Sequence, residues 1–390
     1  MNRAVFPIVA IALVLVQAPA HAADTSQTLA IHAGRILTVA NGVVENGVII
    51  IRDGKIEGVG VGLDVPEGVQ TVDASDKVVV PGFIDAHCHL GLSLHALAEI
   101  DETVQPVTAQ MRIIDAFDPT ADELAEAVRA GVTAAMLAPG SRNPIGGQTA
   151  VVKLAGDRQE RWLVQPSAGV EMSFTNDALM SDRRPTSRPG LITLVQENLD
   201  RTASHKPDTF DPAAEVLSRL TRRELPAYVR ARTVDEISAA LTVIDQYKLM
   251  AVLVDARQAD EIAGVLVERK VPVICGPLLL YSKDHDLKRV GKLAGADVKI
   301  AFASFAPRTS AGDIRTSAIL AVRYGLNRDE ALRALTINAA ELLGLDGRLG
   351  SIQEGRDADL VILDGDPLEP ASRVETVIID GNVVYRRGPK

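Results

Sequence analysis

A regular alternation of strand and helix patterns between residues 82 and 345 limits the fold of this chain more than any other feature. Two of the predicted helices begin with the capping-box pattern of a Thr followed three residues later by a Glu. These pairs are Thr120 with Glu123 and Thr233 with Glu236. Apolar strand runs at 132–137, 251–254 and 271–274 follow predicted helices. Such serial repetition predicts a parallel sheet, either closed into a barrel or open and doubly wound.

The two ends of the chain have a different pattern. Residues 28–80 and 359–385 contain short β-type runs separated by turn pairs such as Asp53-Gly54 and Asp380-Gly381. Neither end has enough strands for a core of its own. We therefore expect an α/β fold: a (β/α)₈ TIM-type barrel over 82–345 and a small β-sandwich built from 23–81 and 346–390.

Composition supports this architecture and excludes some partners. Apolar residues make up 47% of the chain and aromatic residues only 3%, which suits the aliphatic layers of a parallel barrel. The net charge of −10 argues against nucleic acid or an anionic membrane surface as a partner. The two cysteines, Cys88 and Cys275, lie in apolar strand patterns, so we expect two buried thiols and no disulfide framework.

The first 22 residues have the pattern of a cleaved signal peptide. Arg3 supplies the basic start, residues 8–16 the short apolar run, and Ala20-His21-Ala22 the small residues before the cleavage point. The apolar run is too short to span a bilayer. We therefore expect an exported, periplasmic protein.

The strongest local motif is a pair of histidines on a predicted strand. Because alternate residues of a strand point to the same side, His87 and His89 project together and Cys88 projects to the other side. Two imidazoles at the carboxyl end of a barrel strand can chelate one divalent cation.

In these motifs the chain resembles the amidohydrolase superfamily, in particular the branch of imidazolonepropionases and metal-dependent dipeptidases. The resemblance extends over nearly the whole chain after the signal peptide. It rests on Val80-Pro-Gly-Phe-Ile-Asp-Ala-His-Cys-His89, Ala130-Gly-Val-Thr133, Ile145-Gly-Gly-Gln-Thr149, Thr336-Ile-Asn-Ala-Ala340, Gly350-Ser-Ile-Gln-Glu-Gly355 and Asp357-Ala-Asp-Leu360.

The resemblance implies one or two divalent metals, most often zinc, that activate a water for attack on a C–N bond. His87 and His89 match the first-strand ligands, and the substrate would be a small amide, cyclic amide or dipeptide. Lys153 is a candidate for the bridging ligand, although an unmodified lysine extending from a strand end explains it equally well. The Gly-Glu-Asn segment of this branch is replaced by Thr175-Asn176-Asp177, which lacks the Glu.

Other expected positions also depart from the family pattern. Arg230 and Arg232 stand where the fifth strand should supply a His, and Asp255 stands where the sixth should supply another. Phe305 occupies the place of the catalytic Asp, so the catalytic residue is unknown. Asp255 is a candidate third ligand. The arginines either bind a substrate carboxylate or form a structural ion pair with Asp255.

The sequence leaves the roles of two further features undecided. His285 with Asp284 or Asp286 is a reserve metal-binding pair. The polar segment 173–213 interrupts the strand and helix alternation, and is either a lid or contact surface, or a loop without a role.

Two functions follow from these observations. The first is an exported hydrolase of C–N bonds that uses a metal-activated water, with impaired activity and weak metal occupancy. The alternative is a catalytically inactive subunit or binding module on the same fold. In that case we expect self-association or pairing with a complete, paralogous amidohydrolase.

We predict cleavage of the exported chain after Ala22, because the Ala-x-Ala pattern ends there. The intact mass of the periplasmic protein measures this. A periplasmic chain that retains residues 1–22 would contradict the prediction.

Overall fold

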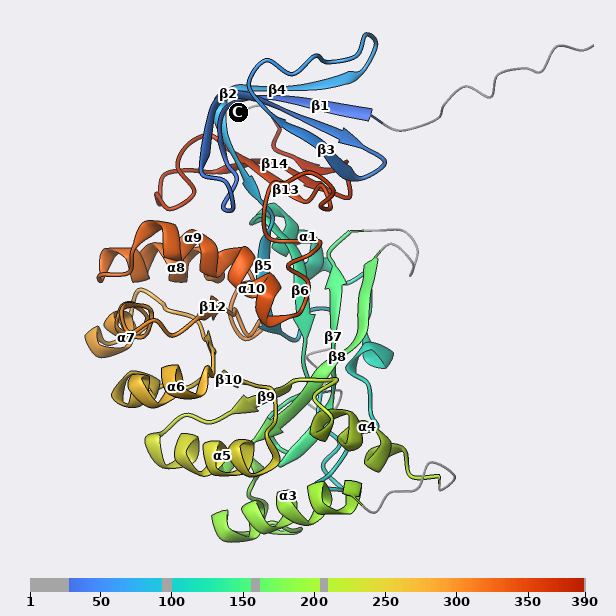
Figure 1. Ribbon diagram of the computed structural model, residues 1–390, viewed down its shortest axis with the longest axis vertical. Coiled ribbons are helices and arrows are strands. Elements are labelled where there is room, and N and C mark those ends of the chain that lie inside the picture. Colours follow the sequence, from blue (N-terminus) through green and yellow to red (C-terminus); the bar gives the residue numbers. More distant parts are fainter. Residues whose placement is uncertain (1–27, 93–99, 156–161, 204–209, 389–390) are drawn as a thin grey trace, which may run out of the picture.

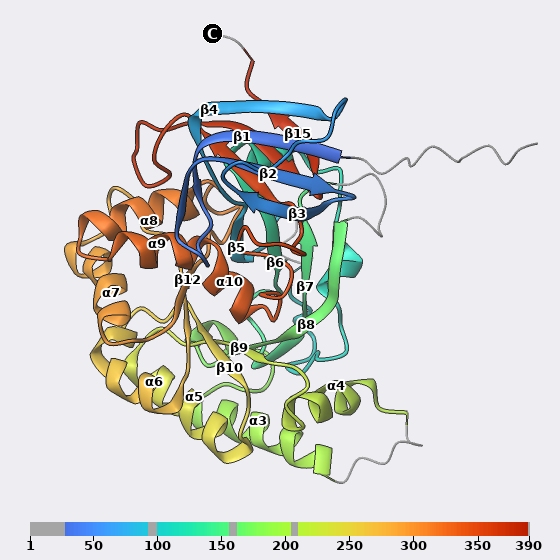
Figure 2. The same ribbon diagram turned by 45° about the horizontal axis from the view of Figure 1, so that its top comes forward.

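The computed structural model describes residues 28–92, 100–155, 162–203 and 210–388 (Figure 1). The predicted signal peptide lies outside these residues. The described part consists of a sheet formed by both chain ends and a barrel of strands surrounded by helices (Figures 1 and 2). No helix in these ranges is long and apolar enough to cross a membrane.

The strands of the two chain ends form one seven-stranded sheet, in the order β15-β14-β13-β4-β1-β2-β3. β4 pairs with β1 on one side and with β13 on the other, so it joins the N-terminal and C-terminal strands. The sheet surrounds an aliphatic core that includes Ile31, Ile49 and Leu360. The strands are β1 (Thr28–Leu37), β2 (Val43–Arg52), β3 (Lys55–Gly60), β4 (Gln70–Pro81), β13 (Leu360–Leu363), β14 (Val374–Ile379) and β15 (Asn382–Arg386).

The second sheet has eight strands, in the order β12-β11-β10-β9-β8-β7-β6-β5, and forms a nearly closed barrel. The predicted fold class is therefore confirmed. One strand departs from the repeat, because β7 runs antiparallel to both β6 and β8. The strands are β5 (Phe83–Cys88), β6 (Val132–Leu137), β7 (Ile145–Lys153), β8 (Leu163–Ser173), β9 (Ala227–Arg230), β10 (Ala251–Val254), β11 (Val273–Cys275) and β12 (Ile300–Phe302).

A buried carboxyl group connects the two ends of the barrel sheet. Asp85 on β5 accepts hydrogen bonds from the backbone N–H of Ser304, at 3.0 Å, and from the Ser304 hydroxyl just beyond β12. Two backbone hydrogen bonds, Phe305 N–H to His87 O and His89 N–H to Ala306 O, continue the connection. Burial raises the pKa of Asp85 to about 7.

The helices cover the barrel, and their caps confirm one sequence prediction and correct another. Thr233 and Glu236 form the predicted capping box of α5. The one predicted at Thr120 is wrong, because the α1 cap is Ala121 and Asp118 accepts the Thr120 hydrogen bonds. The helices are α1 (Asp122–Arg129), α3 (Arg188–Ala203), α4 (Pro212–Thr221), α5 (Val234–Tyr247), α6 (Ala263–Arg269), α7 (Asp284–Gly295), α8 (Asp313–Arg323), α9 (Arg328–Leu335) and α10 (Ile337–Leu342), with short 3₁₀ helices at Ile113–Ala116, Asn176–Ala178 and Ala259–Ile262.

The polar segment 173–213 is not a continuous loop. Its second half forms α3, whose buried Leu191, Leu194, Val195 and Leu199 have helical spacing. The surrounding polar residues hid this stripe in the sequence. The first half of the segment, around Asn176, lies at the rim of the cavity described below.

Both cysteines are buried and free, as predicted from their apolar strands. Cys88 lies on β5, and its Sγ is 3.5 Å from the carbonyl oxygen of Met136.

Lys153 connects the barrel to the terminal sheet. It is buried at the end of β7, where its Nζ contacts carboxylate oxygens of Asp357 at 2.9 Å, Asp359 at 3.0 Å and Asp380. Burial alone would lower the pKa of this lysine, but the three carboxylates raise it above its usual range. The ammonium group therefore stays charged and neutralises acids from the other sheet.

We predict that Lys153→Met lowers the free energy of unfolding by about 3–5 kcal/mol, because it leaves the buried Asp359 carboxylate without its cation. Lys288→Met is the matched control, since the exposed Lys288–Asp284 pair should contribute less than about 1 kcal/mol. Urea denaturation of both variants measures the difference. Equal, small losses would show that the Lys153 cluster does not stabilise the fold.

Candidate functional site

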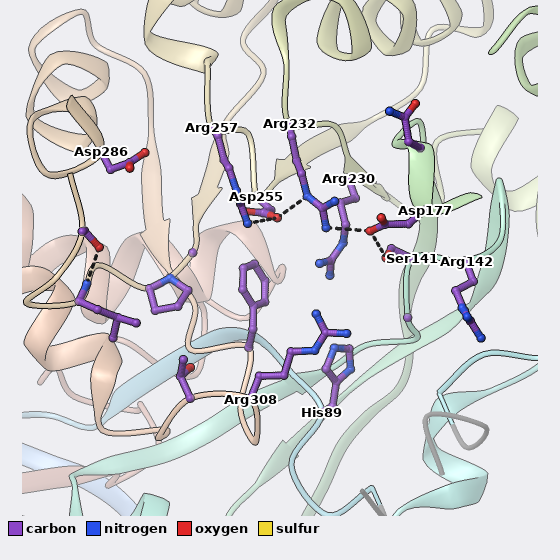
Figure 3. Close-up of a pocket in the computed structure, with 18 of the residues that line it drawn as sticks. His89, Ser141, Arg142, Asp177, Arg230, Arg232, Asp255, Arg257, Asp286 and Arg308 are labelled. Carbon is purple, nitrogen blue, oxygen red and sulfur yellow. Dashed lines mark hydrogen bonds and ion pairs between the residues drawn. The ribbon is translucent and has the colours of Figure 1, made fainter. Parts of the chain in front are cut away.

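A cavity of about 980 Å³ opens where the carboxyl ends of the barrel strands meet (Figure 3). Catalytic and binding residues of barrel enzymes lie at this end. The cavity is rich in cationic side chains, although the whole chain carries a net charge of −10. The charged residues of its wall are Arg142, Arg230, Arg232, Arg257, Lys283, Arg289 and Arg308, with Asp101, Asp177, Asp255 and Asp286.

Of the predicted histidine pair, His89 lines this cavity and His87 is fully buried beside it. The rings of His87 and His89 have centroids 5.6 Å apart and are nearly perpendicular. His89 Nδ1 donates to the carbonyl oxygen of Ala138 at 2.7 Å, which leaves its Nε2 as the available nitrogen. Burial lowers the pKa of His89 to about 3 and that of His87 well below the ordinary value, so both rings are neutral.

Arg230, at the end of β9, lies against the histidine pair instead of pointing away from it. Its side chain is buried, with Nη2 3.3 Å from His87 Nε2 and Nε 3.5 Å from Glu171 Oε1. Its guanidinium carbon also lies 5.0 Å from the centre of the Phe305 ring, within cation–π range. A permanent cation is thus held among an imidazole, a carboxylate and an aromatic ring.

Glu171 on β8 completes this buried group, and Glu171 Oε2 lies 3.3 Å from His87 Nε2. Burial raises the pKa of Glu171 to about 8, although the nearby Arg230 guanidinium opposes the shift. A neutral ring nitrogen either donates or accepts, so His87 Nε2 donates to Glu171 or accepts from Arg230, but not both.

Asp255 lies in the cavity wall with both carboxylate oxygens in ion pairs. Oδ2 is 2.8 Å from Arg232 Nε, and Oδ1 is 3.1 Å from Arg257 Nε (Figure 3). Arg232 also contacts Asp177, with its Nη2 2.8 Å from Oδ2. The structural ion pair between Arg232 and Asp255 is therefore present, and the prediction of Asp255 as a third metal ligand does not fit these contacts.

Phe305 follows β12 and closes one side of the histidine pair. Its ring lies 5.1 Å from the His87 ring in an edge-to-face contact and packs directly on Gly276, where a Cβ would be 2.4 Å from it. The backbone of Phe305 has φ +53°, as that of Asp255 has φ +54°. Left-handed backbone is unusual for such residues and concentrates at functional sites.

Asp101 is a buried carboxyl group in the wall of the same cavity. Burial raises its pKa to about 7, and Oδ1 has no hydrogen-bond partner among the described residues. Oδ2 lies 2.0 Å from the place where a Cβ on residue 140 would be, so only glycine at position 140 leaves room for this side chain.

The arrangement does not fit a resident metal ion. His87, Glu171 and Asp255 are engaged by arginine guanidinium groups, and a guanidinium repels a cation. No group of three or more His, Cys, Asp or Glu residues suited to a metal occurs in the described ranges.

Two other predicted ligands lie outside the histidine site. Lys153 pairs with Ala134 near the start of β6, at the opposite end of the barrel sheet from His87, so its prediction as a bridging ligand is corrected. The reserve pair is an exposed contact of 3.5 Å between His285 and Asp286, and Asp286 also binds Arg289.

The sequence reasoning brought together His87, His89, Arg230, Arg232, Asp255 and Phe305. In the structure the last five line one cavity, and the fully buried His87 contacts His89 and Phe305. It missed Glu171, Asp101, Arg142 and Arg308. Glu171 carried a usable signal, since it is a lone acid within the otherwise uncharged run 166–173 of β8. The other three lie outside strands, where no periodic pattern marks them.

Comparison with known proteins gives consistent matches. A family model described as the amidohydrolase family matches residues 178–385, more than half of the chain. An imidazolonepropionase of Acidiphilium cryptum is 26% identical over 84% of this chain and 89% of its own length. The amidohydrolase tasK of Hapsidospora irregularis is 24% identical over 88% of this chain, which spans only 39% of that protein.

A solved structure also matches along nearly the whole chain. The crystal structure of an amidohydrolase from Thermotoga maritima has a TM-score of 0.86 and 30% sequence identity, and the match covers 92% of this chain and 100% of that one.

We predict that the stability of the protein falls as pH rises from about 6.5, above which the buried His87 and His89 no longer oppose the trend, to about 8. In this window native Glu171 holds a proton that the unfolded chain releases, so higher pH favours unfolding. Asp85 and Asp101 act in the same direction. Glu171→Gln removes one contribution and should make the decline shallower.

Urea denaturation at several pH values measures this slope. The control is Glu354→Gln, which changes an exposed acid and should keep the wild-type slope. An unchanged slope in Glu171→Gln would contradict the raised pKa of Glu171.

Proposed function

The chain belongs to the amidohydrolase family, and from this premise we propose that it binds an anionic small molecule in the barrel mouth without metal-activated hydrolysis. Members of the family are generally metal-dependent, and homologues indicate hydrolysis of C–N bonds. The proposal therefore concerns how this chain differs from its relatives.

One observation carries the proposal: the Arg230 guanidinium lies against the imidazole and carboxylate that would otherwise be available to a metal. A guanidinium is always protonated and offers only donors. It takes the place of a cation beside the Glu171 carboxyl group, but it cannot bind or polarise a water in the manner of a metal ion. It also supports binding of an anion.

The residue at the expected catalytic position supports the same proposal. Phe305 has no group that transfers a proton, and its ring packs against both His87 and Arg230. We propose that the ligand keeps the amide or cyclic-amide character of the family's substrates and carries a carboxylate, which the arginine-rich wall recognises.

We further propose that the protein acts in the periplasm, on the basis of the basic, apolar and Ala-x-Ala pattern of residues 1–22. Pairing with a second copy or with a complete, paralogous amidohydrolase is part of the same proposal, since it would join a binding module to an active enzyme.

We predict substoichiometric zinc in the purified wild-type chain and little hydrolysis of dipeptides or cyclic amides. The double variant Arg230→His with Asp255→His should hold more zinc, because it removes a nearby cation and adds two imidazoles. Arg222→His, on an exposed arginine after α4, is the control and should leave the zinc content unchanged.

Elemental analysis after dialysis measures the metal, and product analysis measures hydrolysis. A wild-type chain with one or more tightly held metals, whose hydrolytic activity is lost in His87→Ala, would overturn the proposal and favour the metal-dependent hydrolase.

A further inference from the structure

Not all cationic side chains of the cavity are neutralised by the protein itself. Four of the six arginines have a carboxylate within 4 Å: Arg230, Arg232, Arg257 and Arg289. The other two, Arg142 and Arg308, form no ion pair with any residue in the described ranges. Arg142 and Arg308 thus line the cavity without a carboxylate within 4 Å of their guanidinium groups, in the part of the chain that the structure describes.

These two arginines belong to different walls. Arg308 follows Phe305 after β12, and its guanidinium lies close to His89 and Arg230 in Figure 3. Arg142 lies in the loop between β6 and β7, on the other side of His89 and next to Ser141. Arg308 also lowers the pKa of His89, which agrees with a cation close to that ring.

We infer that the cavity holds a small dicarboxylate, with one carboxylate on Arg308 beside His89 and the other on Arg142. This inference rests on the proposed function, because it names the ligand class of the same site. A guanidinium matches a carboxylate through two parallel hydrogen bonds, so each of the two arginines can receive one carboxylate end.

The distribution of charge favours two separate carboxylates over one compact anion. The two arginines line a cavity of about 980 Å³ from different strand–loop connections. A single phosphate or carboxylate on Arg308 would leave Arg142 uncompensated. A ligand with two separate carboxylates can place one on each arginine.

Titration calorimetry with glutarate and with its monocarboxylate counterpart, butyrate, tests the inference. Glutarate should bind the wild-type chain at least about tenfold more tightly than butyrate, because each ion-paired hydrogen bond adds to binding. Arg142→Met should reduce glutarate affinity to the level of butyrate and leave butyrate binding unchanged. Arg308→Met should weaken both ligands.

Arg222→Met is the matched control and should bind both ligands as the wild-type chain does, because Arg222 is exposed and outside the cavity. Arg142 and Arg308 are both exposed, so the Arg142→Met and Arg308→Met variants should fold. A thermal melt of each variant verifies this. Inorganic phosphate is the third probe and should bind more weakly than glutarate.

Equal affinities for glutarate and butyrate, or glutarate binding that is unchanged in Arg142→Met, would overturn the inference. If butyrate or phosphate binds as tightly as glutarate and requires Arg308, the proposed function stands but the dicarboxylate does not. Stoichiometric zinc in the same preparation would instead show that the proposed function fails.

Discussion

The buried guanidinium of Arg230 determines the chemistry of the barrel mouth. A permanent cation in a protected position needs polar partners, and the carboxyl group of Glu171 on the adjacent β8 lies 3.5 Å from it. The same cation helps to keep His87 and His89 neutral. A metal ion at this place would face the repulsion of the guanidinium and the loss of Glu171 as a free ligand.

The contacts that hold the scaffold around this site do not involve Arg230. Asp85 with Ser304 connects β5 to the residues after β12, and Lys153 joins the barrel to the terminal sheet through three aspartates. Neither group contacts Arg230. This separation explains how a chain can keep an amidohydrolase fold while its barrel mouth departs from the family pattern.

Sequence reasoning reached much of the fold and part of the site. The alternating strand and helix patterns predicted a parallel sheet, either a barrel or an open doubly wound sheet. The short strands at both chain ends predicted the shared sheet and favoured the barrel. His87 and His89 were found because strand periodicity marks them locally. Lys153 was misjudged because a lysine at a strand end looks the same whether it faces a metal or three carboxylates. The reversal of β7, which decides where Lys153 lies, left no local signal.

The sequence by itself determined the properties that depend on neighbouring residues. These are strand and helix periodicity, the direction of the His87 and His89 side chains, and the residue types at positions 230, 232, 255 and 305. Only the tertiary structure decided which charges meet. Glu171 lies 59 positions before Arg230 in the chain, and Asp255 lies 23 positions after Arg232. Pairing of this kind depends on the order and direction of the barrel strands, because charged groups interact through distance in space and not through separation along the chain.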